Sequence, residues 1–385
     1  MEHLYQYIKP IFSILIVLLL QTSTHAQGCI AIRSGCGANV GGGAILSKGD
    51  FFAGTNFRYF HSYKHFRGQH EETDRVENGT EVINDSYFLD FLVSYGLTDR
   101  LSANLVLPFV YHERSSMYEH GGNPEVDDPL TPENEFWEGD RHKTYSKGLS
   151  DIRFGLNYWL LDPSTHSTTN FAVGLGMKLN SGNYKAEDTF YNPERTANVD
   201  QSIQPGDGGV GATIEVQGFH AFKNGITLTG NLYYLINPRE KYDVVNFRGD
   251  SELSVPDQYA ARLGGLFMLP IHGLSVYGGA RVEGIPSSDF IGGDEGFRRP
   301  GYILSLEPGI NYSIRNFSLN ITVPLAVKRA RTQSYSDKQR TADTGVFRNG
   351  DAAFADYLLN IGLNWRFGKS SVPKLDSVSE PVDIN

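Results

Sequence analysis

No stretch of this sequence is long and apolar enough to cross a membrane as a helix. Such a span needs about 20 consecutive apolar residues, and the most apolar stretch, residues 11–20 (IFSILIVLLL), is much shorter. Cysteine is scarce, with 2 residues in 385, which excludes a disulfide-rich scaffold and a zinc site with four cysteine ligands. Positive charge is in deficit as well. The formal net charge is −10, with Lys and Arg dispersed, which argues against nucleic acid as a partner.

What the sequence does have is apolar and polar residues in alternation. In residues 317–328, Phe317 and Ile321 fall on one face of an extended chain, and Ser318 and Asn320 fall on the other. A period of two is typical of β-strands, in which successive side chains point to opposite faces. The pattern predicts twelve strands, over residues 50–64, 84–97, 101–113, 147–160, 170–181, 210–222, 226–238, 258–270, 274–285, 300–314, 317–328 and 353–367.

The segments between these strands alternate between long and short. The short ones are residues 98–100, 161–169, 223–225, 271–273 and 315–316, and the long ones are 65–83, 114–146, 182–209, 239–257, 286–299 and 329–352. A soluble sandwich has no physical reason to sort its loops in this way. A transmembrane barrel has one, because its short turns lie in the periplasm and its long loops outside the cell. We therefore predict an all-β fold, a transmembrane antiparallel β-barrel of about twelve strands over residues 50–367, in the outer membrane of a Gram-negative bacterium.

The more uniformly apolar face of each strand is expected to meet the lipid, and the mixed face to line the lumen. The lumen face carries charges of both signs. The residues predicted to line the lumen are Arg58, Asp90, Asp151, Arg153, Lys178, Glu215, Arg262, Arg281, Glu283, Glu307, Lys328, Asp356 and Arg366. Two interpretations stay open: these charges orient a polar or amphiphilic solute, or they form ion pairs that hold a narrow barrel closed.

Both ends of the chain lie outside the predicted barrel. Residues 1–26 combine Lys9, a short apolar core and a small residue, Ala26, at the end. These features predict a signal peptide that is removed after secretion. Residues 368–385 do not alternate and are predicted to form a disordered periplasmic tail.

The two cysteines lie in the segment that follows the predicted signal peptide. Residues 27–49 do not alternate and are expected either to lie in the periplasm or to enter the lumen as a plug. Export to an oxidising compartment favours a disulfide between Cys29 and Cys36. A pair of free cysteines, or half of a metal site, remains the alternative.

Four motifs gather in the first two thirds of the predicted barrel. They are YGLTDRL at 95–101 with Leu107-Pro108, GLSDIRFG at 148–155 with Tyr158 and LLD at 160–162, GLGMKLNSGNY at 174–184, and GDGG at 206–209. Together they resemble a family of outer-membrane barrels named for the MetA pathway of phenol degradation. Asn180-Ser181 stands where the family usually has Pro-Thr, and Ser150 where it has Gly. The resemblance implies an outer-membrane transport role and carries over no catalytic residues.

Histidine and acidic residues in the long loops are the candidates for metal binding. His65, His70 and Glu71 are the candidate ligands, and solvated loop side chains are the simpler interpretation, so we predict neither a metal nor a cofactor. The second long loop is acidic and lacks the spacing of a calcium loop. It fits a surface that contacts lipopolysaccharide through divalent ions. Its acidic residues are Asp127, Asp128, Glu133, Glu135 and Asp140.

The predicted function is transport rather than catalysis. His112, Glu113, Ser115 and Ser116 supply hydrolase groups, but the sequence shows neither a base within reach of a nucleophile nor an oxyanion site. We expect passive, substrate-selective passage of a small aromatic or amphiphilic molecule, with membrane lipid and that solute as partners. The alternative is a non-transporting scaffold or receptor whose long loops bind a partner; a barrel hydrolase is a further one.

Overall fold

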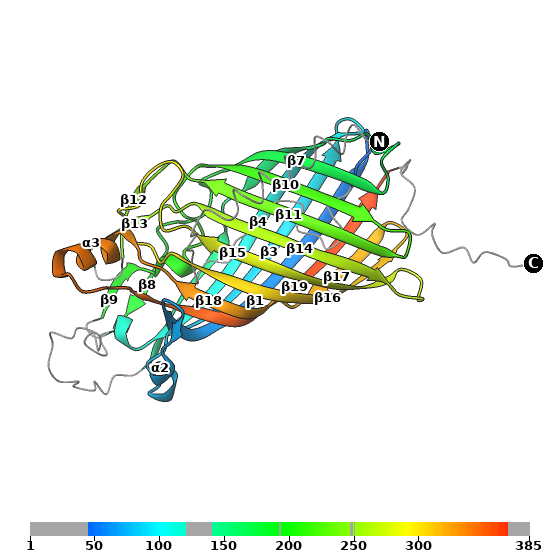
Figure 1. Ribbon diagram of the computed structural model, residues 1–385. Helices are drawn as coiled ribbons and strands as arrows, with labels where there is room; N and C mark the ends of the chain where they lie inside the picture. The colour runs from blue at the N-terminus through cyan, green and yellow to red at the C-terminus, as the bar shows by residue number, and fades with distance from the viewer. Residues whose placement is uncertain (1–44, 121–140, 192–193, 247–248, 250, 369–385) are drawn as a thin grey trace, which may run out of the picture.

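The computed structural model describes residues 45–120, 141–191, 194–246, 249 and 251–368. Within them, one antiparallel sheet closes into a barrel of twelve crossings, as the sequence predicted (Figure 1). The crossings are β1 (Phe51–Arg67), β3 (Ile83–Gly96), β4 (Leu101–Ser116), β5 (His142–Leu149) with β6 (Arg153–Trp159), β7 (Thr169–Lys178), β10 (Gly211–Ala221), β11 (Ile226–Ile236), β14 (Gln258–Met268), β15 (Leu274–Ile285), β16 (Gly301–Ile314), β17 (Phe317–Thr322) with β18 (Leu325–Arg331), and β19 (Asp351–Phe367).

The first and last strands of the barrel pair with each other and close it. β1 and β19 run antiparallel, from Phe51 opposite Phe367 to Arg67 opposite Asp351. Two register shifts interrupt this ladder next to Ser62. Since β1 also pairs with β3 and β19 with β17, both sides of the seam are hydrogen-bonded. A closed sheet satisfies its backbone groups without water, which is the condition for crossing a bilayer with strands.

Two crossings that the sequence predicted as continuous strands are interrupted. The first breaks between β5 and β6, just after Gly148 near the end of β5, whose φ of 137° is one that L-residues rarely reach. The second breaks between β17 and β18 at Pro324, which has no backbone N–H to donate to the ladder. Alternation of side chains does not reveal such breaks, because inward-facing and outward-facing residues continue to alternate on both sides of the break.

The remaining elements gather at the end of the barrel opposite the short turns (Figure 1). They are β2 (His70–Glu71), α2 (Thr73–Glu77), η1 (Tyr118–His120), β8 (Glu187–Phe190), β9 (Arg195–Asn198), η2 (Gln201–Ile203), β12 (Lys241–Val245), β13 (Glu252–Ser254) and α3 (Tyr335–Thr344). The helix α3 begins with a capping box between Ser334 and Asp337 and ends at Gly345, whose φ is 66°. These loop elements were not predicted from the sequence.

The outward face of the barrel is apolar. Large apolar side chains are exposed on it, among them Leu175, Leu263, Leu306, Ile310 and Val327. Near the extracellular end, Tyr59, Tyr87 and Tyr111 form a row, with ring centroids 4.9 and 5.9 Å apart. Aromatic side chains at this level are typical of a membrane interface. None of the helices in the described part of the chain is both long and apolar enough to span a membrane.

The chain enters the barrel across its periplasmic mouth. Ile45 packs against Trp159, Ala172 and Phe219, which point into the lumen near the ends of β6, β7 and β10. Leu46, the next residue, is 2 % exposed. The end of the segment predicted as a plug or periplasmic extension therefore covers part of this mouth. The rest of that segment, with Cys29 and Cys36, lies outside the described residues, as do the predicted signal peptide and residues 369–385.

Candidate functional site

Most of the charged residues predicted for the lumen are inside the barrel. Their side chains belong to strands whose inward positions alternate with exposed apolar ones. The inward residues are Arg58, Asp90, Asp151, Arg153, Lys178, Glu215, Arg262, Arg281, Glu283 and Glu307. Arg366 lies at the periplasmic end of β19, where it pairs with the buried carboxylate of Asp50.

Two of the predicted lumen residues lie elsewhere, because bulges change which face they occupy. A register shift in the β16–β18 ladder sets Lys328 opposite Leu304, and both are exposed on the outer face. Asp356 lies in the bulged stretch of β19 and accepts a hydrogen bond from Tyr63 at 3.2 Å. Its side chain is 35 % exposed and also pairs with Lys64. The prediction was wrong for these two, since a bulge shifts alternation by one residue.

One half of the lumen, toward β14, β15, β16, β19 and β1, is filled by an ion network. Its members are Arg58, Arg262, Arg281, Glu283 and Glu307. Arg281 Nε lies 3.0 Å from Glu283 Oε2 and Arg262 Nε 2.9 Å from Glu307 Oε2. Arg58 reaches Glu283 from β1 at 3.9 Å. Charges this deeply buried need several partners each, and here each carboxylate faces two arginines.

An aromatic ring completes this packed half. Tyr277, 1 % exposed, lies over Gly264 and Gly279, whose missing side chains make room for the ring. The guanidinium carbon of Arg262 lies 4.7 Å from the centre of that ring, which is a cation–π contact. The ring and the ion network therefore pack against each other in this half of the lumen.

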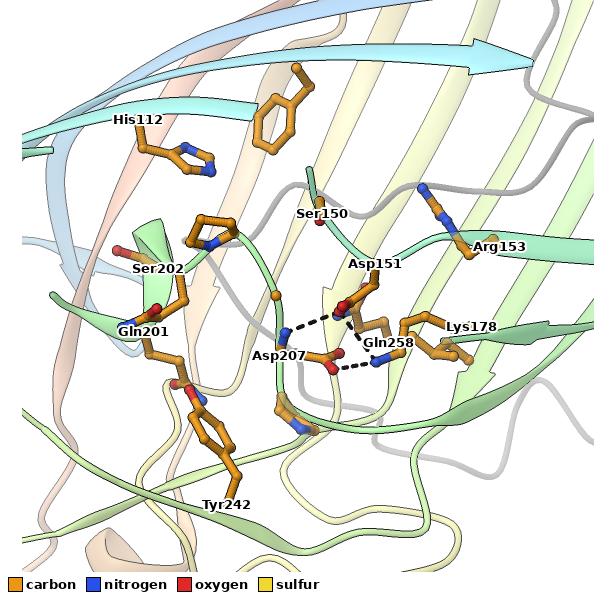
Figure 2. Close-up of a pocket in the computed structure, with 16 residues that line it drawn as sticks. His112, Ser150, Asp151, Arg153, Lys178, Gln201, Ser202, Asp207, Tyr242 and Gln258 are labelled. Atoms are coloured by element: carbon orange, nitrogen blue, oxygen red, sulfur yellow. Dashed lines mark hydrogen bonds and ion pairs between the residues drawn. The ribbon is translucent and has the colours of Figure 1, made fainter. Parts of the chain in front are cut away.

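The other half, along β4, β6, β7, β10 and β11, contains two cavities. The upper cavity, about 80 Å³, lies toward the extracellular end (Figure 2). Its lining is amphiphilic: Phe88, Leu235 and Tyr242 contribute apolar surface, and Gln201 and Gln258 contribute amides. Since about 10–15 Å³ of such space holds one water molecule, it can admit several waters or a small solute.

A buried lysine and two carboxylates form the charged wall of the upper cavity. Figure 2 shows Asp151, Lys178 and Asp207 turned toward one another. Lys178 Nζ pairs with Asp207 and lies 3.6 Å from Asp151. Asp151 also accepts hydrogen bonds from the backbone N–H groups of Gly182 at 2.9 Å and Asp207 at 3.0 Å. Burial raises the pKa of the Asp207 carboxyl, against the opposing attraction of Lys178.

The upper cavity is covered by residues 199–209, which we call the strap. Val199 and Ile203 of the strap are fully buried. Gln201 donates to the backbone oxygen of Ser254 at 2.7 Å. The hydroxyl of Ser146 donates to the backbone oxygen of Ile203. The strap thus contacts both β5 and β13.

A cluster of four buried charges holds the strap in place. Arg299 forms two hydrogen bonds with Asp200, at 2.8 and 2.7 Å. Arg114 lies 3.6 Å from Asp200 and donates to Glu119 at 2.9 Å. Burial alone would raise the pKa of the Asp200 carboxyl, but the two arginines hold this pKa well below its usual range. Asp200 therefore stays ionised and ties β4 and the β15–β16 loop to the strap.

The predicted metal ligands do not form a metal site together. His65, Glu72 and Asp351 converge, but their atoms have protein partners. His65 donates from Nδ1 to Asp351 at 2.6 Å and accepts the Val82 N–H at Nε2. Glu72 accepts from two arginines. His70 and Glu71 form the short β2, and neither belongs to this group. The acidic residues from Asp127 to Asp140 lie outside the described residues.

The hydrolase groups considered in the sequence are separated by the wall of the barrel. His112 points into the lumen and contacts the Ser86 hydroxyl at 3.0 Å. Glu113 points outward and pairs with Lys143. Ser115 and Ser116 are buried at the end of the same strand, β4. Arg141 approaches the hydroxyl of Ser115, and the Glu119 N–H approaches that of Ser116. A nucleophile, base and acid on opposite faces of one strand do not make a catalytic triad.

The closed sheet, apolar outer face and polar lumen are those of an outer-membrane β-barrel. The fold is similar to that of an outer membrane channel from Pseudomonas putida F1, with a TM-score of 0.53 and 12% sequence identity over 84% of this chain and 97% of that chain. Two further solved structures are less similar. A Pseudomonas aeruginosa FadL homologue has a TM-score of 0.43 and 9% identity over 89% and 99%, and the P. putida toluene transporter TodX has 0.38 and 11% over 84% and 92%. No family model and no curated protein matches the sequence.

The strap and its anchors were not predicted from the sequence. Asp207 lies in the GDGG motif at 206–209, which was noted only as part of a resemblance. That motif was the available signal, because an acidic residue among glycines marks a tight turn that brings backbone close to another group. Asp200, Gln201 and Tyr242 carried no sequence signal, since they lie in two long loops without periodicity.

Proposed function

We propose that this barrel allows passive, substrate-selective passage of a small amphiphilic molecule across the outer membrane. The observation that carries the proposal is the upper cavity, which places an apolar surface opposite a charged one inside the lumen. A purely structural barrel gains nothing from a void of about 80 Å³ lined by both kinds of group. The channel from P. putida F1 shares the fold, and its described role is consistent with this proposal. Membrane lipid around the barrel and the solute inside it are the expected partners.

The opposing candidate is a scaffold or receptor that transports nothing. The ion network and the strap favour it, because both fill parts of the lumen. The transporter predicts a flux of solute through the barrel and the scaffold predicts none, so a measurement of flux separates the two candidates.

The test uses the mature chain reconstituted in planar bilayers and in liposomes. We expect small single-channel currents and uptake of benzyl alcohol faster than in liposomes that hold heat-unfolded protein. A parent protein that gives neither current nor uptake would refute the proposal and favour the scaffold.

A further inference from the structure

The charged side chains that line the upper cavity balance one another. Lys178 and Arg153 are positive, and Asp151 and Asp207 are negative. Since these four charges sum to zero, the cavity has no net charge that would favour an anion or a cation. The preference of the cavity for a solute therefore depends on which polar groups in its lining lack a partner within the protein.

The four charged groups all have partners already. An ammonium has three N–H donors, and Lys178 Nζ faces three acceptors. They are the Asp207 carboxylate, the backbone oxygen of Gly209 at 2.7 Å and the Asp151 carboxylate at 3.6 Å. Arg153 also interacts with other groups of the protein. A charged solute would therefore have to displace one of these interactions in order to find a counter-ion.

Two uncharged side chains of the same cavity have hydrogen-bonding groups to offer. The carboxamide of Gln258, at the start of β14, forms no hydrogen bond with the other described residues. Tyr242 of β12 is 1 % exposed, and its hydroxyl has no hydrogen-bond partner in the described part of the chain. Figure 2 shows the ring of Tyr242 turned toward Gln201 of the strap. A buried polar group without a partner destabilises the protein, and a solute that bonds to it removes this cost.

The remaining lining is apolar, and the volume limits the size of the solute. Phe88, Leu235, Pro205 and Pro256 contribute apolar surface. A volume of about 80 Å³ provides roughly five to eight water-sized positions. The upper cavity thus suits a molecule with about that many non-hydrogen atoms, consisting of a short apolar part and one polar head.

The second cavity lies in the same half of the lumen, which we call the open half. It measures about 40 Å³, and Gly174, Asn157 and Thr213 are part of its lining. Arg153 lines both cavities, so the two spaces are neighbours. The carboxylate of the second cavity, Glu215, also has partners within the protein. A solute that leaves the upper cavity therefore again meets uncharged polar side chains.

We propose that the upper cavity binds uncharged solutes whose polar head combines a hydrogen-bond donor with an acceptor, primary carboxamides above all, and discriminates against their ionised analogues. This inference rests on the proposed function and names its class of solute. A primary amide complements Gln258, since each carboxamide can donate an N–H to the oxygen of the other, and the Tyr242 hydroxyl offers a further donor. An ionised head would lose its hydration without gaining an unengaged counter-ion.

The test measures binding and transport separately with one set of solutes. Butyramide and butyrate have the same number of non-hydrogen atoms and differ in charge, and butylammonium carries the opposite charge. Binding to the full mature chain in detergent is followed by ligand-observed NMR titration. Transport is followed by interruptions of the single-channel current and by liposome swelling. We expect the parent to bind butyramide about tenfold more tightly than either ion.

The variants remove the uncharged groups one at a time, and heat-modifiable gel mobility checks that each barrel folds. Q258L should weaken the binding of butyramide about three- to tenfold, as expected for the loss of one or two hydrogen bonds. Q258E should weaken it as well and strengthen the binding of butylammonium. Y242F, which keeps the ring, should weaken it about threefold. The matched control is N311L, because Asn311 is a carboxamide of β16 that lines neither of the two cavities and should leave binding unchanged.

The outcomes separate the binding site from the transport function. Equal affinity of the parent for butyramide and butyrate would overturn the inference, and so would parent-like binding of butyramide in both Q258L and Y242F. Either result leaves transport intact if current and swelling are still observed. Selective binding of butyramide by a protein that gives neither current nor swelling would support the binding site and refute transport.

Discussion

The two halves of the lumen use similar residues to opposite effect. Both contain buried arginines, carboxylates and glycines, yet one half is filled by the ion network with Tyr277 and the other keeps two cavities. In the filled half, each carboxylate lies between two arginines. In the open half, Lys178 is drawn to the wall by Asp151 and Asp207. Composition therefore does not decide whether a lumen is open. The position of the partner with which each charged side chain pairs decides it.

The largest expected effect comes from breaking the ion network. Glu307→Gln removes the charge that faces Arg262 and Arg281, and leaving buried charges unpaired costs about 3–5 kcal/mol. We expect the free energy of unfolding in urea to fall by this amount. Conductance should stay at the parent value in the fraction that folds. An increased conductance would show that the packed half also conducts.

The next effect concerns the anchor of the strap. Asp200→Asn removes the charge shared by Arg114 and Arg299 and leaves both arginines without it, at a cost of about 1–3 kcal/mol. The strap should then exchange its amide hydrogens faster, and the open half should conduct with more frequent transitions to a larger current. Unchanged exchange across residues 199–209 would contradict the role given to Asp200. Asp243→Asn, at an exposed ion pair, is the matched control.

A pair of glycine substitutions compares the two walls directly. A Cβ on Gly264 would overlap the Tyr277 hydroxyl, so G264A should destabilise the barrel by about 1–3 kcal/mol with little change in conductance. A Cβ on Gly174 would lie 3.3 Å from the Cβ of Glu215, which needs only a small adjustment. G174A should therefore keep its stability and reduce the conductance. If instead G174A destabilises the barrel and G264A reduces the conductance, the solute path lies in the half that we describe as packed.

The smallest effect is a pH dependence above the open half. His120 stacks on Phe190, which precedes the strap in the same loop. Burial, with His142 and Arg195 nearby, lowers the pKa of His120 to about 4 from 6.5. As pH falls below about 6.5 the unfolded chain binds the proton first, so the contact loses stability down to about pH 4. The protection of the amides of residues 117–120, taken relative to the intrinsic exchange rate at each pH, should fall over this range in the parent and remain constant in H120F.

Much of the fold was readable from the sequence, and the reason is physical. Lipid outside and a polar lumen inside force strict alternation, so the strands, their faces and the closure followed from period two. The interruptions at Gly148 and Pro324, and the bulge that turns Lys328 and Asp356 outward, did not follow. A bulge adds one residue to a ladder, and only the partner strand shows where it falls.

The inward positions of the alternating strands were predictable, but the contacts among their side chains were not. Arg153 and Arg281 have the same appearance in the sequence, since each lies on an inward face of an alternating strand. Their surroundings differ because of contacts made by other strands: Glu283, which pairs with Arg281, is also approached by Arg58 of β1. Such a contact joins strands far apart in the chain. The strap is a loop without a repeating pattern, and only its closure over the lumen reveals Asp200 as an anchor.

The seam between β1 and β19 has a consequence for biogenesis. Its partners are separated by almost the whole chain, so this ladder is the most non-local contact in the barrel, and non-local pairing forms slowly. Until residues 351–367 arrive, β1 and the growing sheet both present unpaired edges that can join other chains. Loss of the last strand should therefore leave an aggregation-prone intermediate rather than a smaller barrel.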